Sequence, residues 1–184
     1  MSIPDLVQLL ASRSARRGEF TLSSGRPSTL YIDARLTTMS PEGLTIIGSA
    51  GLHALYEAHW NVDSVGGMTL GADPIAYAIA YASAGSDRPI RAFTVRKETK
   101  SHGMGQLIEG PFRSGDSVAV VEDVITTGSS AIKAARAVRD AGGEITGVLA
   151  LVDREEGGRE ALEAEGFRVI ALTRASDIVA RMQS

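Results

Sequence analysis

The sequence contains no cysteine, which excludes disulfide bonds, thiolate metal sites and a cysteine nucleophile. It also lacks any apolar run close to the roughly 18 to 20 residues that a membrane-spanning helix requires. The first residues, Met1 to Asp5, do not place an apolar segment after a basic one, so they do not resemble a secretory signal. We therefore expect a cytoplasmic protein with no membrane partner.

Positive charge is not in excess either. The chain has 19 Lys and Arg against 22 Asp and Glu, a formal net charge of −3, so its bulk charge gives no reason to expect a nucleic-acid partner. Any basic site must be local. With 184 residues, 43% apolar and 22% charged, the composition is that of one globular domain, which we place at residues 1–184.

The usual phosphate-binding loops are absent, because neither GxxxxGK[ST] nor a GxGxxG at a strand–helix junction occurs. Residues 117–131, SVAVVEDVITTGSSA, nevertheless suggest a phosphate site of another design. A small, hydroxyl-rich turn before a helix can approach a phosphate closely, and the helix dipole favours the anion. The acids Glu122 and Asp123 can accept hydrogen bonds from sugar hydroxyls. Two such acids alone are more often a solvated turn or a helix cap; the turn that follows favours a sugar-phosphate site.

Strands and helices alternate from residue 62 to residue 182, which predicts an α/β domain with a mostly parallel sheet covered on both faces. The expected strands are 62–67, 90–95, 117–121, 145–152 and 167–172, and the helices 75–84, 129–141, 155–165 and 175–182. Before them we expect a helix over 4–15, a strand pair around a turn at 23–28, and a helix over 41–59. Residues 96–106 have no apolar period and are expected to form a mobile loop.

Four glycine or polar clusters follow the carboxyl ends of the expected strands: Gly66-Gly67, Arg96-Lys97, Glu122-Asp123 and Asp153-Arg154. Ligands of parallel sheets bind beyond these ends. We therefore expect the four clusters to converge on one site.

The stretch 96–103 contains four potential cations, Arg96, Lys97, Lys100 and His102. Such a run is most often a solvated basic loop. Lys and Arg also bind phosphates, and His can transfer a proton near neutral pH. Gly103 and Gly105 would let such a loop open and close.

These motifs together resemble a known family. VAVVEDVITTGSSA is similar to the phosphoribosyl-pyrophosphate signature of the type I phosphoribosyltransferases. The stretch 96–103, followed by Ile108-Glu109-Gly110, resembles the catalytic loop of the orotate phosphoribosyltransferases among them. FTLSSG (20–25) and YID (31–33) resemble their orotate-side segment, Asp153-Arg154 matches their orotate-binding arginine, and GGMTLGADP (66–74) resembles their pyrophosphate-side loop. The resemblance covers about residues 18 to 154.

The resemblance implies a type I phosphoribosyltransferase fold: a small N-terminal hood from residues 1–60 and an α/β core from 61–184. It implies transfer of the phosphoribosyl group from phosphoribosyl pyrophosphate to orotate, which gives orotidine 5′-monophosphate and pyrophosphate in pyrimidine synthesis. Mg²⁺ would be bound through substrate oxygens and water, without a protein ligand set. The family also implies a homodimer whose active site is shared, with the mobile loop reaching across.

The implied catalytic residues are Lys100, His102, Arg96 and Lys97, which also contact phosphoribosyl pyrophosphate. Glu122 and Asp123 would hold the ribose hydroxyls. The 5′-phosphate would lie on the turn made by Val124, Ile125, Thr126, Thr127, Gly128, Ser129 and Ser130. Orotate would contact Tyr31, Ile32, Thr126 and Arg154.

Two positions depart from the family pattern. Many members carry lysine where this chain has Ser23 and Gly71. A less cationic site is the expected consequence. Arg154 and the basic loop argue against the nearest alternative, a phosphoribosyltransferase for a purine or other base. The same loop and the net charge argue against a second one, a regulator that binds the nucleotide precursor without catalysis.

Overall fold

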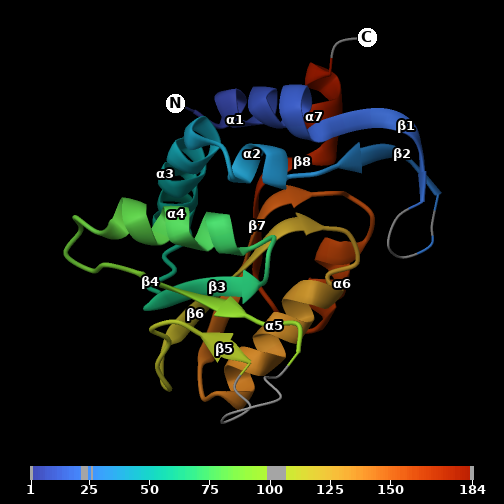
Figure 1. The fold of residues 1–184 in the computed structure, drawn as a ribbon. Coiled ribbons are helices and arrows are strands. Elements are labelled where there is room, and N and C mark those ends of the chain that lie inside the picture. The colour runs from blue at the N-terminus through green and yellow to red at the C-terminus, as the bar shows by residue number, and fades with distance from the viewer. Residues whose placement is uncertain (1, 22–24, 26, 99–106, 183–184) are drawn as a thin grey trace.

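A computed structural model describes residues 2–21, 25, 27–98 and 107–182. Its centre is a six-stranded sheet in the order β5-β4-β3-β6-β7-β8, parallel except for the short β5 (Figure 1). The strands are β3 (Ser64–Met68), β4 (Arg91–Val95), β5 (Ile108–Glu109), β6 (Ser117–Ile125), β7 (Glu144–Asp153) and β8 (Val169–Arg174). The predicted α/β class with a mostly parallel sheet is confirmed.

Helices cover both faces of this sheet, because alternate side chains of its buried strands point in opposite directions. On β6, Ala119 and Val121 belong to the apolar cluster that includes α3 (Pro41–Glu57) and α4 (Asp73–Ser83). Val118 and Val120 belong to a second cluster, formed with α5 (Ser129–Asp140) and α6 (Gly158–Ala164). The run of fully buried apolar residues in this strand is therefore explained by burial on both sides.

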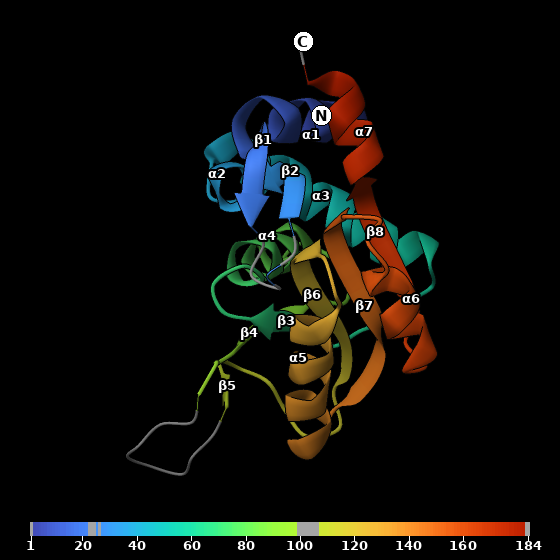
Figure 2. The same ribbon diagram turned by 90° about the vertical axis from the view of Figure 1, so that its right-hand side faces the viewer.

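The N-terminal segment lies above the sheet (Figures 1 and 2) and shares its core, because Leu6 and Leu10 belong to the same apolar cluster as Val121. α1 (Ile3–Leu9) continues into a π-helix, η1 (Leu10–Ser14), and the antiparallel strands β1 (Ala15–Thr21) and β2 (Pro27–Ile32) follow. A short helix, α2 (Arg35–Thr38), leads to α3, whose first turn is capped because Ser40 Oγ accepts from Gly43 N at 3.1 Å. The last helix, α7 (Ala175–Arg181), packs beside α1.

Four elements differ most from the sequence prediction, and the other predicted bounds differ by at most three residues. The first helix changes to a π-helix at Leu10 instead of continuing to residue 15, and α2 and β5 were not predicted. Both are too short, four and two residues, to show a periodic pattern. β6 was predicted to end at Val121 but continues to Ile125, because its backbone still pairs with β7 at Val124 and Val152.

The extension of β6 changes the position of the acid pair. Glu122 and Asp123 lie within the strand and not in a turn after it. Successive strand residues point to opposite faces, but these two side chains still meet, with a hydrogen bond between their carboxyl groups. Among the described residues, no helix is long and apolar enough to cross a membrane.

Candidate active site

The order of the strands places a crevice beside β3. From β3 the chain runs outward to β4 on one side and through β6, β7 and β8 on the other, so the topology switches direction between β3 and β6. Ligands of open parallel sheets bind at such a point, beyond the carboxyl ends of the strands. A cavity of about 480 Å³ lies there.

This cavity brings together nine of the predicted site residues: Tyr31, Ile32, Lys97, Glu122, Asp123, Val124, Thr126, Ser130 and Arg154. They come from β2, from just after β4, from β6 and its turn, from the first turn of α5 and from the residue after β7. Arg96, Ile125, Thr127, Gly128 and Ser129 adjoin these residues in sequence but do not line the cavity. Lys100 and His102 lie outside the described residues.

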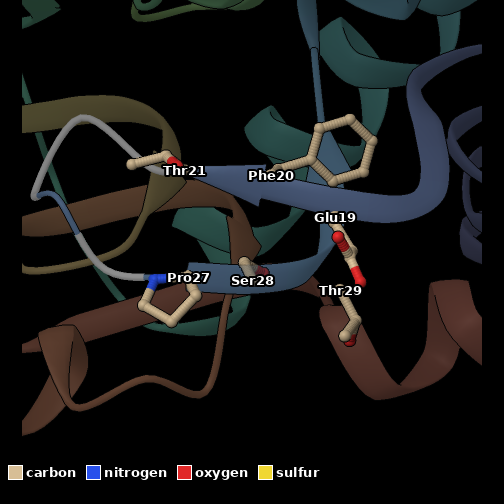
Figure 3. Close-up of a pocket in the computed structure, with 6 residues that line it drawn as sticks. All are labelled: Glu19, Phe20, Thr21, Pro27, Ser28 and Thr29. Atoms are coloured by element: carbon tan, nitrogen blue, oxygen red, sulfur yellow. The ribbon is translucent and has the colours of Figure 1, made fainter.

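A larger cavity, about 850 Å³, lies at the β1–β2 hairpin and is lined by Glu19, Phe20, Thr21, Pro27, Ser28 and Thr29 (Figure 3). The single charged side chain among these six residues is an acid, and it does not suit a phosphate. We therefore place the candidate site at the sheet and not at the hairpin.

The two carboxyl groups of the acid pair on β6 are largely buried, and the pKa of each is raised. Burial, together with the negative charge of Asp123, raises the pKa of the Glu122 carboxyl to about 8. Burial also raises the pKa of Asp123, although Oδ1 accepts from Val124 N at 2.9 Å and the charge of Arg35 acts in the opposite direction. Glu122 Oε2 is buried without a hydrogen-bond partner in the described structure. An acceptor in this state suits an incoming hydroxyl group.

Replacing Glu122 with glutamine is expected to change how stability depends on pH. Because the folded-state pKa lies above the unfolded value near 4.5, the folded protein binds more protons than the unfolded chain between pH 4.5 and about 8. Its free energy of unfolding should therefore fall as the pH rises through this window. Glutamine removes that contribution, so the variant should show a shallower loss. Urea unfolding at pH 5, 6, 7 and 8 without ligand tests this, and identical slopes for the two proteins contradict it.

The hydroxyl-rich turn ends at the start of α5. Gly128 is the N-cap residue with a φ of 77°, a left-handed conformation that glycine adopts without strain. A Cβ there would lie 2.9 Å from the carbonyl oxygen of Gly158, so a larger residue also lacks space. No side chain caps this helix, although Thr127 Oγ1 donates to Ser129 Oγ at 3.1 Å. The Ser129 N–H makes only a long contact of 3.5 Å with Thr127 Oγ1, so the first N–H groups of α5 can turn to an anion.

The loop after β3 approaches the acid pair closely. A Cβ on Gly71 would lie 2.5 Å from Asp123 Cγ, so a side chain here requires the carboxyl to move. The buried Asp73 holds the loop, because it accepts from Thr69 Oγ1 at 2.7 Å and from Thr94 Oγ1 at 2.8 Å. The glycine thus allows the loop backbone to lie directly against β6.

Arg154 is buried directly after β7, and its side chain contacts β2. Its Nη2 donates to Ser28 Oγ and Leu30 O, both at 3.2 Å, and to Glu156 Oε1 at 2.6 Å. Its Nε has no partner among the described residues. A buried guanidinium with an unused donor suits a planar carboxylate.

The two described residues of the basic loop differ in their surroundings. Arg96 pairs with Glu109, with 3.3 Å between Nη1 and Oε1, whereas Lys97 lines the cavity. Asp33, Arg35 and Thr69 also line it. Asp33 and Thr69 belong to the segments 31–33 and 66–74 that resemble the family, but neither was predicted as a site residue. Arg35 lies outside these motifs, and its position three residues after Ile32 was the only signal.

An acid pair and an uncapped, hydroxyl-rich helix start, placed at the switch point of a mostly parallel sheet, define a type I phosphoribosyltransferase. Comparison with known proteins narrows this class. No family model matches the chain. It is 49% identical over 177 residues to an orotate phosphoribosyltransferase of Aquifex aeolicus, an alignment that spans 95% of this chain and 96% of that protein.

Comparison with solved structures supports the same family. A crystal structure of Mycobacterium tuberculosis orotate phosphoribosyltransferase in complex with Fe(III) dicitrate superposes with a TM-score of 0.83 and 44% identity, over 96% of this chain and 98% of the other. A crystal structure of that enzyme in complex with phosphoribosyl pyrophosphate gives a TM-score of 0.80 at 42% identity, with the same coverage. The chain belongs to the orotate phosphoribosyltransferase family.

Proposed function

We propose that this enzyme transfers the 5-phosphoribosyl group from phosphoribosyl pyrophosphate to orotate and releases orotidine 5′-monophosphate and pyrophosphate. The observation that carries the proposal is that one cavity joins the acid pair of β6, the turn before α5 and Arg154. These are the parts needed for a ribose, a phosphate and a planar carboxylate. The related enzyme crystallised with phosphoribosyl pyrophosphate supports it.

The ribose 5-phosphate half is assigned to β6 and its turn. Glu122 and Asp123 accept hydrogen bonds from the 2′- and 3′-hydroxyls, and the backbone from Val124 to Ser130 receives the 5′-phosphate. The free acceptor Oε2 of Glu122 supports the first role, and the uncapped start of α5 supports the second.

Cleavage at the anomeric carbon builds positive charge on the ribose and negative charge on the departing pyrophosphate. Arg96, Lys97 and Lys100 are assigned to stabilise the pyrophosphate, and His102 to donate a proton to it. Mg²⁺, which favours oxygen ligands and retains water, would supply further positive charge for this step. The carboxyl groups of Glu122 and Asp123, which line the cavity, would help to hold it by orienting the ribose.

The acceptor half lies under the hood. The guanidinium of Arg154 binds the carboxylate or a ring edge of orotate, and Tyr31 and Ile32 pack against the pyrimidine ring, with Thr126 beside them. The unused Nε of Arg154 supports this arrangement.

The reaction is tested by following orotate absorbance. Absorbance should fall when phosphoribosyl pyrophosphate and Mg²⁺ are added, while adenine and hypoxanthine should be inert. Consumption of a purine reassigns the acceptor. Binding of phosphoribosyl pyrophosphate without turnover of any base favours the regulator.

We also propose a homodimer in which the loop containing Lys100 serves the partner's site. Lys100→Ala and Asp123→Asn subunits should each be nearly inactive alone when phosphoribosyl pyrophosphate is held near the KM of the unaltered chain. Unfolded together and refolded as a mixture, they should regain about a quarter of the unaltered activity at that concentration. Half of the random dimers are hybrids, and each hybrid has one complete site out of two. Size measurement must show dimers. Activity that stays at the level of the separate variants contradicts sharing.

A further inference from the structure

Arg35 is a further cation in the described lining of the active-site cavity, and the reaction scheme above gives it no role. It is the first residue of α2, which follows β2. Its guanidinium is partly exposed to solvent, with 48% of the side chain accessible, so a ligand in the cavity can reach it.

The orientation of the Arg35 side chain is fixed before any ligand arrives. Its Nε and Nη2 donate to the two carboxylate oxygens of Asp33 at 2.8 and 3.0 Å, and its backbone N–H donates to the same carboxylate at 3.2 Å. Nη1 has no hydrogen-bond partner in the described structure. The guanidinium group of Arg35 therefore keeps at least two N–H donors for an anion, while the carboxylate of Asp33 fixes its plane.

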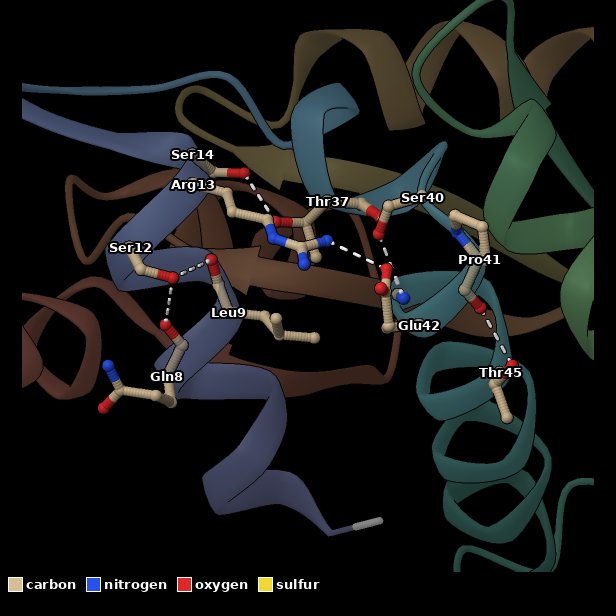
Figure 4. A network of polar contacts seen from close by, with 11 residues as sticks. Gln8, Leu9, Ser12, Arg13, Ser14, Thr37, Ser40, Pro41, Glu42 and Thr45 are labelled. Carbon is tan, nitrogen blue, oxygen red and sulfur yellow. Dashed lines mark hydrogen bonds and ion pairs between the residues drawn. The ribbon is translucent and has the colours of Figure 1, made fainter.

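The segment that carries Arg35 is itself anchored. Thr37 Oγ1 and Ser14 Oγ, both buried, are 2.7 Å apart, and Asp33 N donates to Ser14 O at 2.9 Å. Figure 4 shows this contact beside the exposed pair of Arg13 and Glu42, whose Nη1 and Oε2 are 3.0 Å apart. The end of the π-helix thus positions α2 against the cavity. Such π-helical turns are frequent at functional sites.

Few cations other than Arg35 line the described part of the cavity. Arg96 is paired with Glu109 and Arg154 with Glu156, while Gly71 contributes no side chain to the wall beside Asp123. The positive charge of Arg35 already acts on Asp123, where it offsets part of the rise in pKa that burial causes. Pyrophosphate carries several negative charges. Of the described residues of the basic loop, Lys97 alone lines the cavity.

We propose that Arg35 binds the pyrophosphate group of phosphoribosyl pyrophosphate and of the released product. This inference rests on the function proposed above and adds a residue to it. The free Nη1 donors contact the phosphate oxygens, and Asp33 keeps the guanidinium turned toward them. Arg35 thereby supplies positive charge on the side of the cavity where Gly71 supplies none.

The test compares two products on full-length protein. Pyrophosphate with Mg²⁺ and, separately, orotidine 5′-monophosphate are titrated into the unaltered chain and into Arg35→Ala by calorimetry. Loss of a charge-assisted contact should weaken pyrophosphate binding by roughly 10- to 100-fold. The nucleotide has no pyrophosphate, so its affinity should stay within about threefold. The KM for phosphoribosyl pyrophosphate should rise more than the KM for orotate.

Two further variants separate binding from structure. Arg35→Lys keeps the charge but loses the fork and should bind pyrophosphate with intermediate affinity. Arg13→Ala, the matched control, removes an arginine–carboxylate pair from the same region outside the cavity and should leave both affinities unchanged.

The inference is overturned if Arg35→Ala binds pyrophosphate normally, or if both affinities fall in parallel, which indicates a structural role. If Arg35→Ala does not fold, Asp33→Asn replaces it. This variant loosens the fork and should weaken pyrophosphate several-fold, and unchanged binding is again contrary to the inference. An unaltered chain that binds neither product refutes the proposed function itself.

Discussion

Turnover is expected to fall by ~100-fold or more when Lys100 is replaced with alanine, while the fold stays intact. The departing pyrophosphate gains negative charge in the transition state, and a preorganised cation that meets this charge lowers the barrier by about 3 to 4 kcal/mol. Lys100 lies outside the described residues, so this expectation rests on the resemblance of its loop and on the chemistry of the leaving group.

The measurement is the turnover number at saturating orotate and phosphoribosyl pyrophosphate. Lys133→Ala is the matched control, because Lys133 is exposed on α5 and does not line the cavity. Its turnover should equal that of the unaltered chain. Thermal unfolding should be the same for all three proteins. Near-normal turnover of Lys100→Ala removes the loop from the catalytic scheme.

The sheet could be predicted from the sequence because its strands are buried on both faces and its helices follow at regular intervals. Elements defined by pairing with distant residues could not. The end of β6 is set by its ladder to β7, and that ladder continues past two acids which, in sequence alone, mark the end of an apolar run. α2 is fixed by the contact between Thr37 and Ser14, 23 positions earlier.

The same distinction holds for the candidate site. The acid pair and the hydroxyl turn are contiguous in sequence, so their pattern could be recognised. Arg35 could not be found in this way. Its electrostatic effect on Asp123 arises only because the start of α2 and β6 line the same cavity. Arg154 followed from the strand-end rule, but its contacts with Ser28 and Leu30 span more than 120 residues. No sequence pattern marks contacts of that kind.

The departure at Gly71 acquires a physical reason from the structure. Its backbone lies so close to Asp123 that even a Cβ would meet the carboxyl. A lysine here therefore requires a different position of Asp123 or of the loop. We infer that this chain gives up a cation on the loop and provides one from α2, whose Arg35 also acts on Asp123. Ser23, the other departure, lies outside the described residues.

Asp123→Asn is expected to weaken binding of phosphoribosyl pyrophosphate by roughly 10- to 100-fold, the range for losing a hydrogen bond to a charged group. Asparagine retains one acceptor oxygen but introduces an N–H₂ group that cannot accept from a ribose hydroxyl. Calorimetry with Mg²⁺ present measures the affinity. Asp87→Asn, at an exposed position between α4 and β4, is the matched control and should bind normally. Unchanged affinity in Asp123→Asn contradicts the ribose role of the acid pair.

The same variant has a second expected effect, which separates lost charge from lost hydrogen bonding. After burial, the negative charge of Asp123 is the next largest cause of the raised pKa of Glu122. Asparagine removes this charge, so the pKa of Glu122 should fall toward its ordinary value, and burial alone should keep it above 4.5. Carbon-detected NMR titration of the carboxyl group in the ligand-free protein measures it. A pKa that stays near 8 means that the negative charge of Asp123 does not set the protonation of Glu122.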